Sequence, residues 1–217
     1  MSRSKLAKFK VIGESANVIE PGKPLFEVIK GSWQTFYFNN NHDIVLEIGC
    51  GKGDYTIGLA NLFPNKNFIG VDIKGSRLWK GSTLAQEQGL TNVAFLRNFI
   101  ENIPLNFAEN EISELWITFP DPRPRLGEAK KRLTSGRFLD IYESIVQPGG
   151  LIHFKTDDQV LFEYTLALLQ ERGASQLQYT FDLYQSDLQH YTLGIQTTYE
   201  KRFLNEGVTI KYLQYTV

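Results

Sequence analysis

Residues 44–54, IVLEIGCGKGD, are the stretch from which the rest of this chain can be interpreted. They combine a short apolar run, an acid at Glu47, and a loop that contains Gly49, Gly51 and Gly53. The residues that follow have apolar positions at helical spacing, so the stretch predicts a strand, a glycine turn and a helix. Glycines let such a turn adopt backbone angles closed to other residues and leave no side chain between the backbone and a ligand.

The spacing of the glycines argues against a dinucleotide ligand. The dinucleotide fingerprint requires G-x-G-x-x-G, whereas here Gly53 comes one residue early and Asp54 takes the expected glycine position. The acid before the loop, Glu47, suits a cationic ligand better than a phosphate. S-adenosylmethionine fits, because it has an amino group and a sulfonium and no phosphate. A generic glycine turn of an α/β domain is the alternative.

Two further strand ends carry polar side chains. NFIGVD ends in Asp72, and VAFLRN ends in Asn98. An acid at the end of the second strand of such a fold typically binds ribose hydroxyls, and open α/β sheets bind ligands at the carboxyl ends of their strands. We therefore expect a cofactor site lined by Glu47, Gly49, Gly51, Asp72 and Asn98.

The bulk composition is that of a globular chain. It has 217 residues, 42% hydrophobic and 22% charged, enough for one sizeable core. The single cysteine, Cys50, cannot form an internal disulfide, which fits a reducing compartment, and we interpret it as a small residue in a tight place. No apolar run reaches transmembrane length, and the N-terminus lacks the apolar core of a signal peptide. We expect a cytoplasmic protein with no membrane contact.

Charge is uneven along the chain. The net charge of −1 gives no hint of nucleic acid, but residues 1–10 and 123–137 are strongly basic. Basic clusters are commonly solvated faces, so this observation counts only modestly towards a nucleic-acid partner. We expect residues 1–24 to form a basic, loosely ordered arm and residues 25–217 to form one domain.

Strand and helix patterns alternate through that domain. Helices are expected at about 54–63, 76–88 (with Ser76 as N-cap), 135–146 and 158–172, and strands from residue 44 and at 67–72, 93–98, 114–119, 151–155, 176–182 and 208–215. Alternation of this kind predicts a doubly wound, mostly parallel sheet with helices on both faces. The last two strands lack a crossover helix and are expected to pair as a hairpin. The fold class is therefore α/β, a Rossmann-like class I methyltransferase fold with seven strands, one of them antiparallel.

The loop after the fourth strand carries a fixed carboxylate. In TFPDPRP, prolines at 120, 122 and 124 fix φ at alternate positions, so Asp121 is held in one place beside the predicted cofactor site. Stiff loops position reacting partners well. A rigid turn with a solvated aspartate is the alternative.

The order of motifs resembles the bacterial tRNA (guanine-N7)-methyltransferases. LEIGCGKG, GVD, FPDP with a basic run, KTD and TTYE follow one another from about Ile44 to the end of the chain. FPDP with its basic run and TTYE are the specific parts. The resemblance implies methyl transfer from S-adenosylmethionine to N7 of a guanine in the variable loop of tRNA.

The resemblance also implies roles for individual residues. Glu47, Asp72, Asn98 and Asp121 would contact S-adenosylmethionine, with Asp121 also catalytic. The tRNA substrate would be bound by Arg125, Asp157, Thr197, Thr198, Tyr199 and Glu200, and RNA phosphates by Lys130, Lys131 and Arg132. The chain departs from the family's FPDPWPKKRH at Arg123, which replaces the tryptophan, and its basic run is re-spaced. Asn98 stands where an aspartate is frequent.

Guanine N7 carries a lone pair and no proton, so the transfer needs no general base. The enzyme must align nucleophile, methyl carbon and sulfur, and a fixed carboxylate stabilises the positive charge that moves onto the ring. Asp121 is the candidate for that carboxylate, with Asp157 and Glu200 as further acceptors from guanine.

Plainer roles remain open for several of these residues. Thr156 or Asp157 would also serve as a helix cap, and TTYEKRF as a surface segment. The three histidines lack metal-ligand spacing, so no metal is expected.

Three alternative functions also remain open. They are an NAD-dependent oxidoreductase, an RNA-binding protein without catalysis, and a methyltransferase for a base amino group, whose D/N-P-P-Y/F/W motif is broken here by Arg123. The tRNA species, and the choice between monomer and homodimer, stay undecided.

Overall fold

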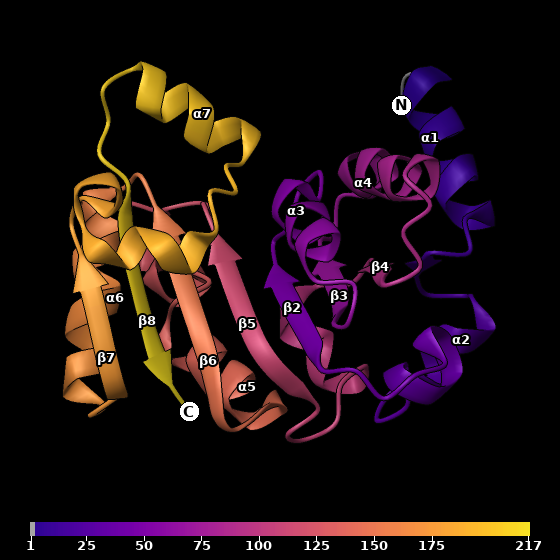
Figure 1. Cartoon of the computed structure of the whole chain (residues 1–217), viewed down its shortest axis with the longest axis horizontal. Helices are drawn as coiled ribbons and strands as arrows, with labels where there is room; N and C mark the ends of the chain where they lie inside the picture. Colours follow the sequence, from indigo (N-terminus) through magenta and orange to yellow (C-terminus); the bar gives the residue numbers. More distant parts are fainter. Residues whose placement is uncertain (1–2) are drawn as a thin grey trace.

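The computed structural model describes residues 3–217, which fold around one eight-stranded sheet of order β1-β4-β3-β2-β5-β6-β8-β7 (Figure 1). The strands are β1 (Val18–Ile19), β2 (Ile44–Ile48), β3 (Asn67–Val71), β4 (Val93–Leu96), β5 (Ile112–Thr118), β6 (Val146–Thr156), β7 (Ser175–Thr180) and β8 (Lys211–Thr216). Strands β1 to β6 pair in parallel, and β8 runs antiparallel to both β6 and β7. The predicted mainly parallel α/β sheet with one antiparallel strand is confirmed. The count of seven strands was one too few, because β1 adds a two-residue edge strand.

Helices cover both faces of the sheet. They are α1 (Arg3–Glu14), α2 (Pro24–Val28), α3 (Asp54–Leu62), α4 (Gly75–Glu87), α5 (Gly136–Ile145), α6 (Gln159–Glu171) and α7 (Thr198–Asn205), with a π-helical segment at Trp33–Phe38 and 3₁₀ turns at Ile100–Leu105, Leu126–Lys131, Leu183–Gln185 and Asp187–Thr192. No helix within residues 3–217 is both long and apolar enough to cross a membrane.

The core is divided by the sheet into two clusters. In β2, Leu46 joins the cluster that contains Trp33, while its neighbour Val45 joins the cluster that contains Tyr55. Successive strand residues point to opposite faces, so strands buried on both sides need the continuous apolar runs seen in this sequence.

The N-terminal segment contains helix α1 and strand β1, and residues 1–2 lie outside the described residues. That residues 1–24 form a loosely ordered arm remains a prediction. Ile12 and Val18 are fully buried. Lys23 explains how the segment is held: its ammonium donates to the carbonyls of Ile12, Ser15 and Val18 at 2.7–2.9 Å. One cation thereby satisfies acceptors at the end of α1 and at the start of β1, which helix ends otherwise leave unpaired.

Two helix starts differ from the sequence predictions. Helix α4 begins at Gly75, and Ser76 lies inside it, so Ser76 is not the N-cap. Asp158, rather than Thr156 or Asp157, caps α6: its carboxylate accepts from the Leu161 amide at 2.7 Å. The position of the cap differs by only one residue, because neighbouring Thr and Asp residues have similar capping preferences.

Candidate active site

The glycine loop lies at the carboxyl end of β2 and joins it to α3. Gly49, Gly51 and Gly53 all have positive φ, at 69°, 58° and 75°. A Cβ atom at Gly53 would also lie 2.7 Å from the Phe95 ring. Both the backbone angles and the close packing therefore require glycine.

The larger cavity beside this loop, about 370 Å³, brings together residues from successive strand ends. It is lined by Gly49, Asp72, Ile73, Lys74, Arg77, Asn98, Phe99, Ile100, Glu101, Phe119, Pro120, Asp121, Arg123, Lys131, Leu133 and Phe138. Of the predicted cofactor ligands, Gly49, Asp72, Asn98 and Asp121 meet here. The volume falls within the range of small-molecule sites.

Asp72 has acceptor capacity to spare inside this cavity. One carboxylate oxygen accepts from the Gly51 amide at 3.1 Å and the other from the Lys74 amide at 2.7 Å. An ionised carboxylate offers about four acceptor positions, so two ribose hydroxyls can still be bound. Asp72 is therefore free to make the predicted hydrogen bonds with the ribose of the cofactor.

Asn98 is engaged by the protein itself. Its amide donates to Asn106 at 2.7 Å and accepts from the Phe99 amide at 2.8 Å. Phe99 is 57% exposed and lines the same cavity. Asn98 therefore fixes the turn that presents an aromatic side chain to the ligand.

Glu47 does not reach either cavity. It is buried, and its oxygens accept from the Thr56 amide and hydroxyl at 2.9 and 2.5 Å and from the Thr118 hydroxyl at 2.7 Å. Burial raises the pKa of Glu47 to about 7, although the hydrogen bonds from the two threonines act to lower it. Glu47 orients Thr118, which lines the smaller cavity, and the predicted contact of Glu47 with the cofactor remains a prediction.

The FPDP loop is held in an unusual backbone conformation. Phe119 and Arg123 both have φ of 48°, which is uncommon for residues with a side chain and costs about 1–3 kcal/mol each. Phe119 stacks on Phe203 of α7 at 6.1 Å between ring centroids. The Asp121 side chain is 78% exposed at the cavity rim, and its carboxylate lies 3.9 Å from the Arg123 guanidinium.

A smaller cavity of about 50 Å³ adjoins the first and reaches the start of α7. It is lined by Gly49, Cys50, Gly51, Lys52, Asp54, Arg77, Thr118, Phe119, Thr197, Thr198 and Tyr199. The predicted substrate residues Thr197 to Tyr199 thus meet the glycine loop, although more than 140 residues separate them. One carboxylate oxygen of Asp54 ties them together, accepting from the Thr198 amide at 2.8 Å and hydroxyl at 2.6 Å.

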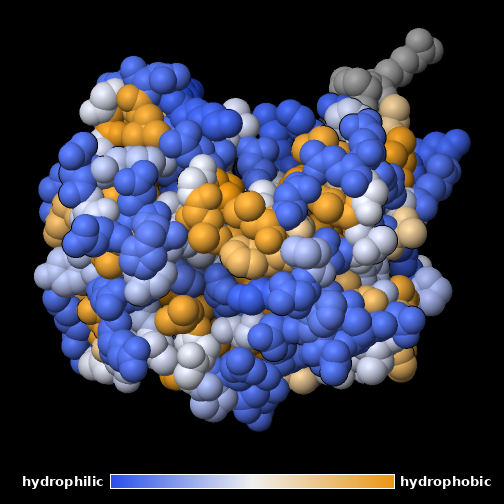
Figure 2. Space-filling model, in the orientation of Figure 1, coloured by the Kyte–Doolittle hydropathy of each residue, from blue (hydrophilic) through white to orange (hydrophobic). Residues whose placement is uncertain are grey.

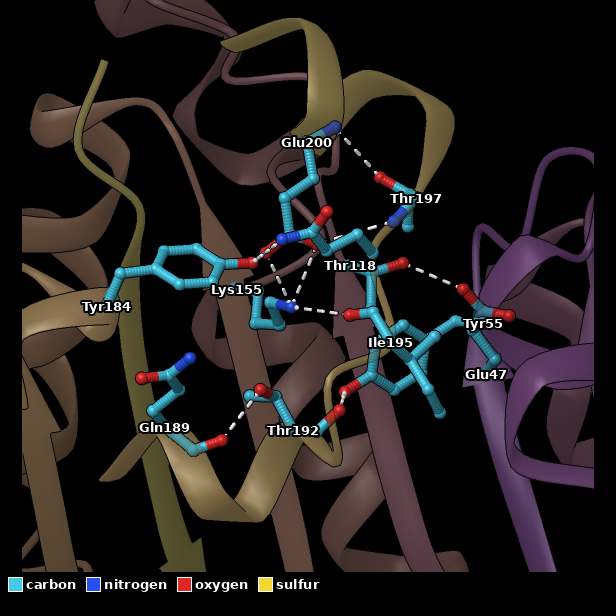
Figure 3. Close-up of polar contacts among 11 residues, drawn as sticks. Glu47, Tyr55, Thr118, Lys155, Tyr184, Gln189, Thr192, Ile195, Thr197 and Glu200 are labelled. Atoms are coloured by element: carbon cyan, nitrogen blue, oxygen red, sulfur yellow. Dashed lines mark hydrogen bonds and ion pairs between the residues drawn. The ribbon is translucent and has the colours of Figure 1, made fainter. Parts of the chain in front are cut away.

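Glu200 points toward Lys155 and Tyr184 (Figure 3). It is fully buried, and its carboxylate pairs with the Lys155 ammonium at 2.7 Å and accepts from the Tyr184 hydroxyl at 2.9 Å. It also completes a capping box with Thr197 at the start of α7. The Glu200 carboxylate is therefore already paired with protein groups, and its predicted contact with guanine remains a prediction.

Lys155 is equally buried, at 0% exposure. Burial lowers its pKa, and the charge of Glu200 opposes that change. A buried ion pair of this kind persists only where both partners are held. The pair therefore fixes α7 above the end of β6 (Figures 1 and 3).

The basic segment divides into exposed and buried members. Arg125, Lys130 and Lys131 are exposed, whereas Arg132 is only 4% exposed, donates to the Arg123 carbonyl and lies 4.4 Å from the Tyr164 ring centroid. The predicted phosphate contact by Arg132 therefore remains a prediction for a side chain that is buried. This side chain holds the FPDP loop from inside.

Asp157 is half-buried at the end of β6. Burial raises its pKa, and its backbone carbonyl accepts from the Lys211 ammonium at 2.9 Å. It lines neither cavity, so its predicted substrate contact remains a prediction. Cys50 packs against Gly70, and burial raises the pKa of its thiol well above the usual value, which leaves it protonated and weakly nucleophilic. Residues 3–217 contain no group of three or more His, Cys, Asp or Glu arranged for a metal ion.

Sequence reasoning missed three residues of this site. Phe119 and Asp54 lie inside quoted motifs but were not assigned roles, and the conformation of Phe119 has no local sequence signal. Arg77 lines both cavities from the first turn of α4. A lone cation in a helix gives no sign of what it faces.

The chain is similar to known methyltransferases. A family model described as a putative methyltransferase matches residues 41–213. A tRNA (guanine-N(7)-)-methyltransferase of Cytophaga hutchinsonii is 50% identical, over 99% of this chain and 98% of its own. Another, of Lactococcus lactis subsp. cremoris, is 36% identical over 98% of this chain and 95% of its own.

Solved structures share the fold at low identity. The 16S rRNA methyltransferase KamB has a TM-score of 0.61 at 17% identity, over 88% of this chain and 90% of its own. A 16S rRNA (adenine(1408)-N(1))-methyltransferase with its cosubstrate, from Catenulisporales acidiphilia, has a TM-score of 0.58 at 13% identity, over 86% and 90%. These two likenesses concern the fold alone. The sequence relatives decide the family: this chain belongs to the tRNA (guanine-N7)-methyltransferases, which use S-adenosylmethionine.

Proposed function

We propose that this protein methylates N7 of a guanine in tRNA, the variable-loop guanine by family resemblance, and that it does so in the cytoplasm. One observation carries the proposal: the 370 Å³ cavity is lined both by Gly49 and Asp72, which are predicted to bind the cofactor, and by Asp121 of the FPDP loop. A cofactor bound at Gly49 and Asp72 would therefore share the cavity with the Asp121 carboxylate.

S-adenosylmethionine supplies an electrophilic methyl group on a sulfonium. Asp72 would accept hydrogen bonds from the ribose hydroxyls, and Phe99 would contact the adenine face. Gly49 allows the backbone to approach the ligand. Thr118, oriented by the buried Glu47, adds a hydroxyl at the adjoining cavity. These groups bind and orient the cofactor.

Asp121 is proposed to act on the guanine. N7 needs no base to remove a proton, so the protein's task is alignment and charge stabilisation. The Asp121 carboxylate is exposed at the cavity rim and only weakly paired with Arg123. It can therefore accept hydrogen bonds from the base and stabilise the positive charge that grows on the ring.

The RNA surface is proposed to surround the cavity. Lys130, Lys131 and Arg125 are exposed and would neutralise phosphates, which position RNA without reading its sequence. Tyr199 is 47% exposed beside the smaller cavity. An aromatic side chain in this position offers a face on which a base can stack.

The test is incubation with unmodified tRNA and labelled S-adenosylmethionine, followed by nucleoside analysis. The expected product is 7-methylguanosine. Another methylated nucleoside would refute the N7 assignment while retaining methyl transfer, and absence of labelled RNA would refute methyltransferase activity on tRNA.

Asp121→Asn tests the mechanism. It keeps the shape and one acceptor oxygen but removes the charge. Loss of one preorganised electrostatic group typically lowers kcat about 10²–10³-fold, and we expect the lower end because the ring charge is delocalised. Single-turnover rates at saturating tRNA and cofactor measure this step.

Glu128→Gln is the matched control for Asp121→Asn. Glu128 also pairs with Arg123, at 3.5 Å, but lies outside the cavity. If release of Arg123 caused the loss, both variants would be slow. A wild-type rate in Asp121→Asn would remove this carboxylate from the mechanism.

A further inference from the structure

Arg77 is placed where the two cavities of the site join. Only Gly49, Arg77 and Phe119 line both the larger and the smaller cavity. Of these three, Arg77 alone has a charged side chain. It projects from the first turn of α4, which follows Asp72 by a short loop. The residue is therefore tied to the strand end that carries the predicted ribose ligand.

The guanidinium of Arg77 has no acceptor among the side chains and backbone groups that the structure describes. It is half-buried, yet no hydrogen bond or ion pair joins its side chain to any of residues 7–217, whose side chains the structure describes. Other arginines that are at least half-buried do have acceptors: Arg97 binds Glu20, Arg123 lies near Asp121 and Glu128, and Arg132 binds a backbone carbonyl. Removing a cation from water without pairing it costs free energy. An anionic ligand would restore the missing interactions.

The charge of Arg77 acts at the glycine loop. Burial raises the pKa of the Cys50 thiol, and the positive charge of Arg77 opposes that rise. Cys50 and Lys52 of the loop also line the smaller cavity. At about 50 Å³ this cavity has room for a small polar group rather than a base or a sugar.

The chemistry of S-adenosylmethionine identifies the anion. The molecule has one carboxylate, at the methionyl end opposite the adenosine. With its ribose at Asp72 in the larger cavity, its methionyl end would be able to reach the smaller cavity past Gly49, which lines both. A planar guanidinium matches a carboxylate through two parallel hydrogen bonds. We propose that Arg77 binds the methionyl carboxylate of S-adenosylmethionine; this rests on the proposed placement of the ribose at Asp72.

Calorimetry with two ligands tests the assignment. Arg77→Met should raise the Kd for S-adenosylmethionine about 10- to 100-fold, the typical loss for charged hydrogen bonds. The Kd for decarboxylated S-adenosylmethionine, which has the same adenosine and sulfonium, should change less than about twofold. Arg77→Lys, which keeps the charge but loses the planar fork, should be intermediate. Lys80→Met is the control, because Lys80 is exposed on the same helix and lines neither cavity.

The outcomes separate this inference from the function itself. Unchanged affinity for S-adenosylmethionine in Arg77→Met, or an equal loss with the decarboxylated ligand, would overturn it. A lower salt dependence of tRNA binding with unchanged cofactor affinity would also overturn it and assign Arg77 to an RNA phosphate. Binding is measured without tRNA, so failure to form 7-methylguanosine would leave this test intact. Circular dichroism and melting of each variant check that it is folded.

Discussion

Replacing Glu200 by glutamine tests whether this residue holds α7 in place or contacts the substrate. Both Glu200 and Lys155 are fully buried, and their nearest charged atoms are 2.7 Å apart. After Glu200→Gln, the Lys155 ammonium would keep only neutral partners: the remaining side-chain oxygen at position 200, the Ile195 carbonyl at 3.5 Å and the Tyr55 ring at 5.1 Å. The charge would then be buried and poorly compensated.

The expected magnitude follows from that burial. Removing one partner of a buried ion pair costs about 3–5 kcal/mol. For a chain of this length each kcal/mol shifts the Tm by about 2–4 °C, so Glu200→Gln should melt about 6–20 °C lower. The double variant Lys155→Met with Glu200→Leu leaves no unpaired charge and should recover most of that loss. Differential scanning calorimetry at neutral pH measures both.

Glu206→Gln is the control on the same helix. Glu206 pairs with Arg202 one turn further along α7, but both side chains are largely exposed. Its replacement should leave the Tm unchanged, because exposed pairs contribute little.

Two results would refute the reasoning about the buried pair. One is a Tm of Glu200→Gln within about 1 °C of wild type. The other is a double variant no more stable than the single one. A raised KM for tRNA without loss of stability would instead restore Glu200 as a substrate contact.

Two further predictions concern pH and salt. Burial raises the pKa of Glu47 to about 7 and lowers that of His153 to about 4. Between about pH 4.5 and 6.5, Glu47 is therefore protonated in the folded protein and ionised in the unfolded chain, whereas His153 is neutral in the folded protein and protonated in the unfolded chain. As pH rises, Glu47 therefore lowers the free energy of unfolding and His153 raises it. Denaturant unfolding across this window should show a steeper rise in Glu47→Gln and a shallower one in His153→Gln, each by up to about 1.4 kcal/mol per pH unit, and slopes equal to wild type would contradict the assignment. Replacing Lys130 and Lys131 by alanine should reduce the salt slope of tRNA binding by about 0.9 for each duplex phosphate that these lysines neutralise. Arg132→Ala should lower the Tm and leave that slope unchanged, and a reduced slope would return Arg132 to the RNA surface.

The hydrophilic rim between α7 and α4 in Figure 2 lies at the carboxyl ends of the strands, where the sequence predicts the site. The prediction follows from the order of apolar runs and polar loops along the chain. The glycine loop, Asp72, Asn98 and the FPDP loop each directly follow an apolar run, and parallel strands bring their carboxyl ends to one edge. The strand patterns themselves come from continuous apolar runs, which sheets buried on both faces require. The family, too, was identified from motif order alone.

Tertiary structure decided which charged residues are available to a ligand. The sequence predicted ligand contacts for Glu200, Arg132 and Glu47, yet each of these side chains is buried against protein partners. Lys155 lies 45 residues before Glu200, and Thr118 lies 71 residues after Glu47. The position of α1 also depends on a tertiary contact, because Lys23 donates hydrogen bonds to carbonyls at the end of this helix. Whether a charged side chain can be buried depends on which distant group pairs with it. A buried charge without a partner strongly destabilises the fold, whereas a paired one is tolerated. Residue type and local pattern do not contain this information.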